Sequence, residues 1–246
     1  PQLAPDLFTR LTLTKTSREQ AAVRRANDVA CIGLEAFYET IRPGATEIDI
    51  AAAVEYAIHR CSGRDGSGYA RGWAHVQGGE NIYWGGTYSR SSGNALAEGD
   101  LVIIELATCV DGYWSDLTRT TGVGTISDQK LELLGAVQDA QKRAIEAIRP
   151  GASHESIHAA ARDSFAEKNL AEGFPHNCGH HVGFRYHDRG PTLIGGNPQP
   201  IEAGMVLTVE PGTYGREYGG GARFEDDVLV EQDGCTVLSK IDLQPY

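Results

Sequence analysis

Four carboxylates and one imidazole are the side chains of this sequence with the clearest capacity for chemistry: Glu105, Asp116, Glu210, Glu225 and His180. Glu105 and Glu210 each interrupt or end an apolar run, where an uncompensated anion is very costly to bury. An oxygen-rich set with a single nitrogen is suited to two divalent cations held close together, and bound cations would neutralise these acids. We therefore expect a metal centre wherever the five residues meet.

An internal repeat indicates that they do meet. The pentapeptide Ile-Arg-Pro-Gly-Ala at 41–45 recurs at 148–152, and the apolar segment that ends in Glu105 aligns with the segment that ends in Glu210, 105 residues later. Each of these glutamates is followed by a second acid a short distance downstream. Two copies with so long a period indicate a duplicated half-domain and not a solenoid. A two-fold relation between the halves would bring both acid pairs to one axis.

The apolar periodicity predicts the same order of elements twice: helix, helix, then strands. Asp111-Gly112 is a strong hairpin signal and should fold the strand carrying Asp116 back beside the strand carrying Glu105. A capping-box pattern from Ser17 to Gln20 should begin the first long helix. The fold class is therefore α+β, with helices packed on one side of a curved, mostly antiparallel sheet. The expected helices cover 17–41, 46–59, 127–148 and 153–168, and the expected strands cover 72–77, 80–84, 101–109, 113–123, 205–209, 223–231 and 236–241.

Length and composition are those of an ordinary globular protein, with 246 residues, 41% hydrophobic and 22% charged. We expect one catalytic domain over 1–246, with 1–16 as an irregular lead-in and no N-terminal domain. The sequence starts at Pro1 without a methionine, which is compatible with a processed or trimmed product.

The net charge of −11, from 22 Lys and Arg against 33 Asp and Glu, comes without any basic run. This argues against nucleic acid and against an anionic membrane as partners. No stretch approaches the length of a membrane span, and no signal-peptide pattern opens the chain. The five cysteines are scattered and form no CxxC pair, which favours a cytoplasmic location.

Some of the candidate ligands have simpler explanations. Asp116 could pair with Arg119 instead of a metal. Glu225 is followed directly by Asp226 and Asp227, and composition alone does not decide which of the three binds, although the repeat favours Glu225.

Histidines gather between 176 and 187. One imidazole suits an oxygen-rich metal site, and others can donate hydrogen bonds to a carbonyl or a tetrahedral intermediate. A second histidine pattern, His154-Glu155-x-x-His158, matches a zinc-protease motif. It begins at the start of a predicted helix, where the helix dipole disfavours a cation, and its repeat counterpart has no histidine, so we interpret it as coincidence.

The segments LVIIE, SDLTRT, HNCGHH, LTVEPG and ARFEDD resemble the pita-bread metallopeptidases, which include aminopeptidase P, prolidase and methionine aminopeptidase. The likeness runs from about residue 15 onward and is greatest to the proline-specific members. It implies a pita-bread fold of duplicated half-domains and a dinuclear centre held by Glu105, Asp116, His180, Glu210 and Glu225. It also implies that His176 and His187 contact substrate or intermediate and that Arg223 steadies the surrounding network.

The function that we expect is hydrolysis of the Xaa-Pro bond of short peptides by a metal-bridged hydroxide, with Glu210 taking the proton and passing it to the leaving amine. The two ions should be manganese by preference, with cobalt, iron or zinc as alternatives. We expect a homodimer. The alternatives are a creatinase-like hydrolase of another amide or C–N bond, and a non-catalytic peptide-binding homologue.

Two positions depart from the pattern of the family. Glu105 stands where the first ligand is normally aspartate, and the extra methylene moves its carboxylate outward. Proline-specific members usually carry a histidine shortly before the first metal strand, whereas here 82–88 contains none, and Tyr83 or Tyr88 is the candidate substitute.

Overall fold

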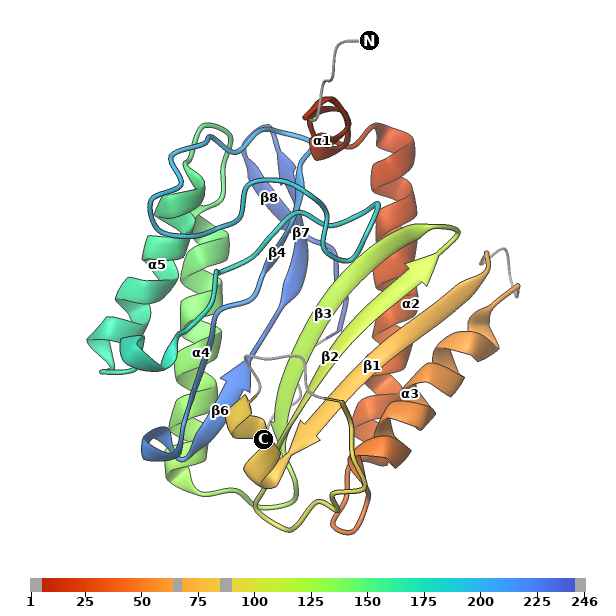
Figure 1. Cartoon of the computed structure of the whole chain (residues 1–246), viewed down its shortest axis with the longest axis vertical. Coiled ribbons are helices and arrows are strands. Elements are labelled where there is room, and N and C mark those ends of the chain that lie inside the picture. The colour runs from red at the N-terminus through yellow and green to blue at the C-terminus, as the bar shows by residue number, and fades with distance from the viewer. Residues whose placement is uncertain (1–5, 64–67, 85–89, 242–246) are drawn as a thin grey trace.

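The computed structural model describes residues 6–63, 68–84 and 90–241. Two helix pairs flank three small antiparallel sheets, so that the duplicated halves lie side by side (Figure 1). The helices are α1 (Leu7–Leu13), α2 (Ser17–Thr40), α3 (Glu47–Cys61), α4 (Asp128–Ala147) and α5 (His154–Glu167), with short 3₁₀ turns η1 (Gly79–Trp84), η2 (Ala171–Gly173) and η3 (Arg216–Tyr218). The strands are β1 (Ala70–Gly78), β2 (Leu101–Val110), β3 (Tyr113–Gly122), β4 (Val206–Val209), β5 (Gly212–Gly215), β6 (Gly220–Arg223), β7 (Asp226–Glu231) and β8 (Gly234–Val237).

The sheets have the orders β1-β2-β3, β4-β7-β8 and β5-β6, and every named strand pair is antiparallel. The β2–β3 hairpin turns at Asp111 and Gly112, which have φ of 50° and 87°. Such left-handed conformations at both central residues match the twist of the flanking strands. The expected α+β class and the position of this hairpin are thus confirmed.

Helix ends follow the sequence signals closely. Thr16, and not Ser17, caps α2 through a reciprocal box with Glu19, one residue earlier than predicted. Thr46 and Asp49 form the same box at the start of α3. A side-chain oxygen at the N-cap satisfies a backbone N–H that would otherwise lack a partner, which fixes where each helix begins.

Each half has its own hydrophobic core, and β2 contributes to both. Its even-numbered residues Val102, Ile104 and Leu106 pack with α2 and α3, whereas Leu101 and Ile103 pack into the core of the second half. Side chains alternate between the two faces of a strand. Glu105 therefore points to the inner face, toward the second half.

A seam of buried polar groups joins the halves. Thr118 of β3 forms an isolated bridge with Glu225, just before β7. Arg119, with a side chain 1% exposed, donates to the Glu225 carbonyl oxygen at 2.7 Å and to Asp226 Oδ1 at 2.6 Å. Gln141 of α4 donates to the other carboxylate oxygen of Asp226 at 3.0 Å. Arg119 thus pairs with Asp226 at this seam. Asp116 does not form the ion pair with Arg119 that the sequence left open.

Three predicted stretches differ in the structure. The lead-in 1–16, expected to be irregular, contains α1, because the prolines lie before its N-cap Asp6 and do not interrupt it. The expected strand at 80–84 is the 3₁₀ turn η1, since Gly79 turns the chain at φ 56° and Asn81 is held by Glu47. The expected strand 223–231 is divided between β6 and β7, because β6 pairs with β5 whereas β7 pairs with β4.

Within the described residues no helix is long and apolar enough to cross a bilayer.

We predict that Arg119→Met destabilises the protein by about 3–5 kcal/mol, because it leaves the buried Asp226 carboxylate without its charged partner. Urea unfolding followed by circular dichroism measures this change. Arg143→Met removes an exposed pair with Glu167 and is the matched control, with little change expected. Equal unfolding midpoints for the two variants would contradict the seam as a major source of stability.

Candidate metal centre

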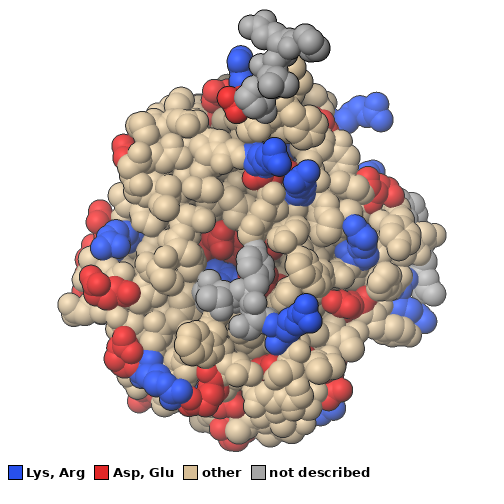
Figure 2. All heavy atoms as spheres, viewed as in Figure 1, with Lys and Arg blue, Asp and Glu red and all other residues tan. Residues whose placement is uncertain are grey.

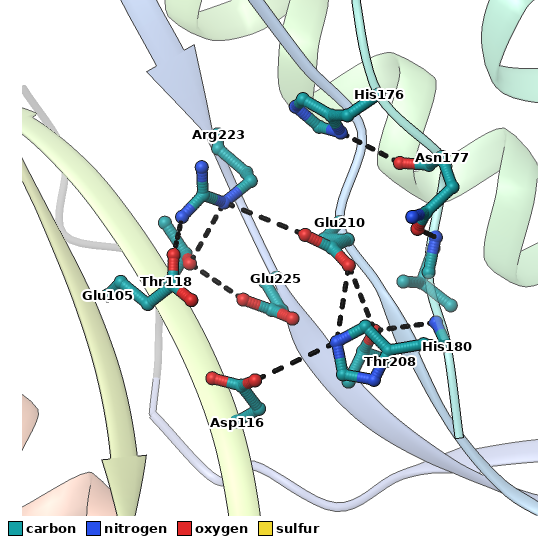
Figure 3. Close-up of polar contacts among 12 residues, drawn as sticks. Glu105, Asp116, Thr118, His176, Asn177, His180, Thr208, Glu210, Arg223 and Glu225 are labelled. Atoms are coloured by element: carbon teal, nitrogen blue, oxygen red, sulfur yellow. Dashed lines mark hydrogen bonds and ion pairs between the residues drawn. The ribbon is translucent and has the colours of Figure 1, made fainter. Parts of the chain in front are cut away.

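The strand register places the predicted ligands on one inner face. Glu105 of β2 lies opposite Thr118 of β3, and Thr118 bridges across the seam to Glu225. The β4–β7 ladder ends one residue before Glu210, so Glu210 comes to face Glu225. Glu105, Thr118, Glu225 and Glu210 thus form one row across both halves (Figure 3).

A second row lies beside the first. Asp116 is two residues from Thr118 on the same face of β3, and its backbone N–H donates to Asp227 Oδ2 at 3.2 Å. His180 lies next to β4, where the Thr208 N–H donates to the His180 carbonyl oxygen at 2.8 Å and the His180 N–H donates to Thr208 Oγ1 at 3.1 Å. The two rows bring all five predicted ligands to one region, as the repeat indicated.

The His180 ring is oriented as a metal ligand. Its Nδ1 lies 3.0 Å from the carbonyl oxygen of His181. A carbonyl oxygen only accepts, so Nδ1 carries the proton and Nε2 presents its lone pair. That lone pair faces Glu210 Oε1 at 3.4 Å and Asp116 Oδ2 at 3.7 Å, and none of the described residues donates a hydrogen bond to it. A lone pair aimed at two ionised carboxylates is repulsive unless a proton or a cation lies between them.

Carboxylate oxygens around His180 also lack donors within 6–63, 68–84 and 90–241. Both side-chain oxygens of Asp116 and Oε1 of Glu225 are buried there without a hydrogen bond. Burial raises the pKa of Asp116 and of Glu225 well above the ordinary values, and the neighbouring glutamates raise both pKa values further. Burial also raises the pKa of Glu210 to about 8, although Arg223 opposes this shift. The donor set fits a divalent cation, which would supply the missing partner for each of these atoms.

Potential ligand atoms fall into two groups among the described residues: Asp116, His180 and His187, and His180, Glu210 and Glu225. Glu105 belongs to neither group. Its Oε2 is instead paired with Arg223 Nη2. The same guanidinium donates from Nε to Thr118 Oγ1 at 3.1 Å and from Nη1 to the Tyr214 hydroxyl at 2.8 Å.

The other predicted histidines occupy different places. His187 Nε2 is 3.4 Å from Asp116 Oδ2, and its side chain is 43% exposed, at the open side of the centre. His176 lies apart from the carboxylates, with Nδ1 bonded to the Asn177 carbonyl (Figure 3). Its Nε2 is bonded to the Tyr214 hydroxyl at 3.2 Å. Burial lowers the pKa of His176 to about 4, so this ring is neutral at pH 7.

The two histidines of the HExxH pattern, His154 and His158, contribute to packing. His154 is fully buried, with Nδ1 2.7 Å from the Gln199 carbonyl oxygen. His158 stacks on Phe174, with ring centroids 5.2 Å apart. Neither histidine joins a ligand group in the described part of the chain, in agreement with our interpretation.

Several supporting residues were not predicted from the sequence. Thr118 donates to Glu225 Oε2 at 2.7 Å, Thr208 donates to Glu210 Oε1 at 3.4 Å, and Asp227 accepts from the Asp116 backbone. Thr118 and Thr208 do lie two residues from Asp116 and Glu210, on the same strand faces, which was the available signal. Tyr83, a candidate donor, lies under the Arg216 guanidinium at 4.6 Å from its ring centroid, and Tyr88 lies outside the described residues.

Comparison with known proteins decides the family. The profile of metallopeptidase family M24 matches residues 21–232. The chain belongs to metallopeptidase family M24. It is 37% identical over 97% of its length to a probable dipeptidase PepE of Mycobacterium tuberculosis, and 32% identical over 96% to an Xaa-Pro dipeptidase of Pyrococcus furiosus. It covers 62% of the first relative and 66% of the second, so the chain spans about two thirds of their length or less.

Solved structures confirm the fold of this M24 chain. Prolidase from Pyrococcus furiosus superposes with a TM-score of 0.88 at 31% identity, covering 96% of this chain and 68% of that one. Dipeptidase PepE from Mycobacterium ulcerans superposes with a TM-score of 0.89 at 32% identity, covering 99% and 64%. The pita-bread fold expected from the resemblance is therefore confirmed. Family M24 uses a dinuclear metal centre, and the unpartnered atoms around His180 fit that requirement.

We predict that the gain in melting temperature on adding Mn²⁺ is larger at pH 8 than at pH 6.5. The pKa of Glu210 is about 8 in the folded chain, whereas its ordinary value is 4.5. Protonated Glu210 therefore stabilises the metal-free fold at low pH, and this stabilisation is lost as the pH rises toward 8. The lowered pKa values of His176 and His180 matter only below about pH 6.5. Differential scanning calorimetry of chelated and Mn²⁺-loaded protein measures the difference.

Glu210→Gln is the control for this pH dependence, because an amide does not titrate. The metal-free variant should lose part of the decline between pH 6.5 and 8. A Mn²⁺-induced shift that is absent, or equal at the two pH values, would contradict the assignment of buried carboxylates to a cation.

Proposed function

We propose that this chain is a divalent-metal-dependent peptidase that hydrolyses the Xaa-Pro bond of short peptides. The observation that carries the proposal is the unprotonated His180 Nε2 among buried carboxylate oxygens that lack donors in the described part of the chain, in an M24 fold. Relatives named dipeptidase and Xaa-Pro dipeptidase support the substrate class.

In this proposal Asp116, His180, Glu210 and Glu225 hold the metal, with Glu105 as the fifth predicted ligand. A bound divalent cation polarises a carbonyl and lowers the pKa of water, so that a nucleophile is available near neutral pH. The oxygen-rich donor set favours manganese over zinc.

Glu210 is placed to handle protons. Its Oε1 accepts a hydrogen bond from Thr208 at 3.4 Å, and its side chain is only 16% exposed. Glu210 takes the proton from the attacking water and later passes it to the leaving amine of the proline, a role open to this carboxylate once a bound cation lowers its pKa.

The substrate carbonyl is expected between His187 and the row of Arg223, Tyr214 and His176. His187 is exposed on the open side and can donate to a developing oxyanion. On the other side, Arg223 donates to the Tyr214 hydroxyl, which therefore donates to His176 Nε2. His176 Nε2 is thus the acceptor of the Tyr214 hydrogen bond, and His176 acts by orienting Tyr214 and Arg223.

An aromatic wall continues the inner face beyond Asp116. Trp73 of β1 lies in the same row as Asp116, separated only by Ala107. Its ring makes an edge contact with Tyr186 at 5.5 Å between centroids, and Tyr186 contacts Trp114 at 5.7 Å. Trp73 is 44% exposed beside the metal centre, a position that suits packing against an apolar part of a peptide.

We predict that the Mn²⁺-loaded protein cleaves Ala-Pro faster than Ala-Ala, and that Glu210→Gln lowers kcat by about 10²- to 10⁴-fold because proton transfer is lost. Release of proline, measured with peptides of two and three residues, tests the activity and separates a dipeptidase from an aminopeptidase. Calorimetry should show the variant folded.

Glu146→Gln changes the same functional group on an exposed part of α4 and should retain wild-type kcat. The proposal fails if Mn²⁺-, Co²⁺- and Fe²⁺-loaded protein leave Xaa-Pro peptides intact, or if Glu210→Gln cleaves them at the wild-type rate.

A further inference from the structure

A buried ion pair joins the segment before α2 to the loop that carries His187, residues 183–188, which we call the histidine loop. Lys15 Nζ lies 3.1 Å from Asp188 Oδ2, and the two side chains are 0% and 6% exposed. An unpaired ammonium or carboxylate is very costly to bury, so each of these groups depends on the other. The pair therefore connects a segment outside the duplicated elements to the open side of the metal centre.

The backbone around Lys15 is fixed against the beginning of β4. Thr14 forms an isolated antiparallel bridge with Met205, and the Lys15 N–H donates to the Gly204 carbonyl oxygen at 2.8 Å. Gln20 of α2 donates to the Lys15 carbonyl oxygen at 2.8 Å. Both backbone polar groups of Lys15 are thus bonded, and its side chain extends from a rigid base.

The histidine loop is arranged around the other end of the ion pair. Asp188 Oδ1 accepts from the Arg185 N–H at 2.8 Å, and Oδ2 accepts from the Phe184 N–H at 3.3 Å. Gly183 has a φ of 142°, and a Cβ there would lie 2.8 Å from Lys15 Cε. The aliphatic part of Lys15 therefore packs directly against the start of the loop, while its ammonium group binds the end of it.

Asp188 also connects the ion pair to the metal ligand His180. The Asp188 backbone N–H donates to the His181 carbonyl oxygen at 2.8 Å. The same oxygen lies 3.0 Å from His180 Nδ1, the contact that directs Nε2 toward the carboxylates. His187 immediately precedes Asp188, and its ring centroid is 4.0 Å from that of His180. Displacement of Asp188 would therefore disturb both imidazoles.

We propose that Lys15 is a positioning residue of this site: its ion pair with Asp188 holds His180 in the orientation that binds a cation and holds His187 beside the centre. Lys15 acts through Asp188 and not on the reacting atoms. The inference rests on the proposed function for the role of His187, whereas the role of His180 requires only that a cation binds.

Calorimetric titration of chelator-treated protein with Mn²⁺ tests the role at His180. Lys15→Met should weaken Mn²⁺ binding about 10- to 100-fold, the range found when a partner of a metal ligand is removed. Steady-state cleavage of Ala-Pro at saturating Mn²⁺ tests the role at His187. The variant should lose about 10- to 100-fold in kcat with little change in KM, because a displaced His187 affects the developing oxyanion more than the bound substrate.

Two further variants separate positioning from stability. Val54→Ala opens a cavity in the fully buried core of the first half, so it should lower the melting temperature but keep the wild-type Mn²⁺ affinity and kcat. The double variant Lys15→Met/Asp188→Asn leaves no unpaired buried charge and should melt at a higher temperature than Lys15→Met. It should still bind Mn²⁺ at least about 10-fold more weakly than wild type, because the tie to the histidine loop is lost.

The proposal is overturned if folded Lys15→Met and the double variant bind Mn²⁺ with wild-type affinity, or if Val54→Ala weakens binding as much as they do. Where Lys15→Met does not fold, the double variant gives the same decision. An unchanged kcat at saturating Mn²⁺ overturns the role at His187. Wild-type protein that binds Mn²⁺ but leaves Ala-Pro intact overturns the proposed function alone, since the affinities still test Lys15, and wild-type protein that binds no Mn²⁺ overturns both.

Discussion

Uncompensated negative charge at the seam is the constraint on which the rest of the structure depends. Asp116 and Glu225 are buried among other acids, with oxygens that no donor from the described residues reaches, and the neighbouring His180 Nε2 presents a lone pair instead of a proton. The Arg223 guanidinium neutralises part of this charge through its ion pair with Glu105. A cation bound at His180, as we propose, would compensate this charge.

The duplication explains how the chain brings these acids together at one place. Each half contributes one hairpin-like pair of strands, and the Thr118–Glu225 bridge joins them into one row of acids. Arg119 and Gln141 bury Asp226 just beneath that row, so the scaffold fixes the backbone from which Glu225 projects. Glu105 and Asp116 consequently lie on paired strands, and Glu210 and Glu225 lie directly beside the ends of β4 and β7, so the two cores set their positions. A rigid base of this kind holds ligands at defined positions before a cation arrives.

Much of this arrangement could be predicted from the sequence, because it follows from local patterns that repeat. The β2–β3 hairpin depends on Asp111 and Gly112, and the equivalence of Glu105 and Glu210 depends on a 105-residue period. What escaped prediction depends on contacts between distant segments. The break between strands β6 and β7 reflects a change of strand partner. The role of Tyr214 depends on its contacts with both Arg223 and His176. The extra methylene of Glu105 was visible in the sequence, but its partner Arg223 was not.

Anomalous X-ray diffraction from crystals of the Mn²⁺-soaked protein tests the central claim most directly. We predict a strong manganese peak within coordination distance of His180 Nε2 and of oxygens from Asp116, Glu210 and Glu225. A map with no peak at this position, or with manganese bound only elsewhere on the chain, would contradict the account.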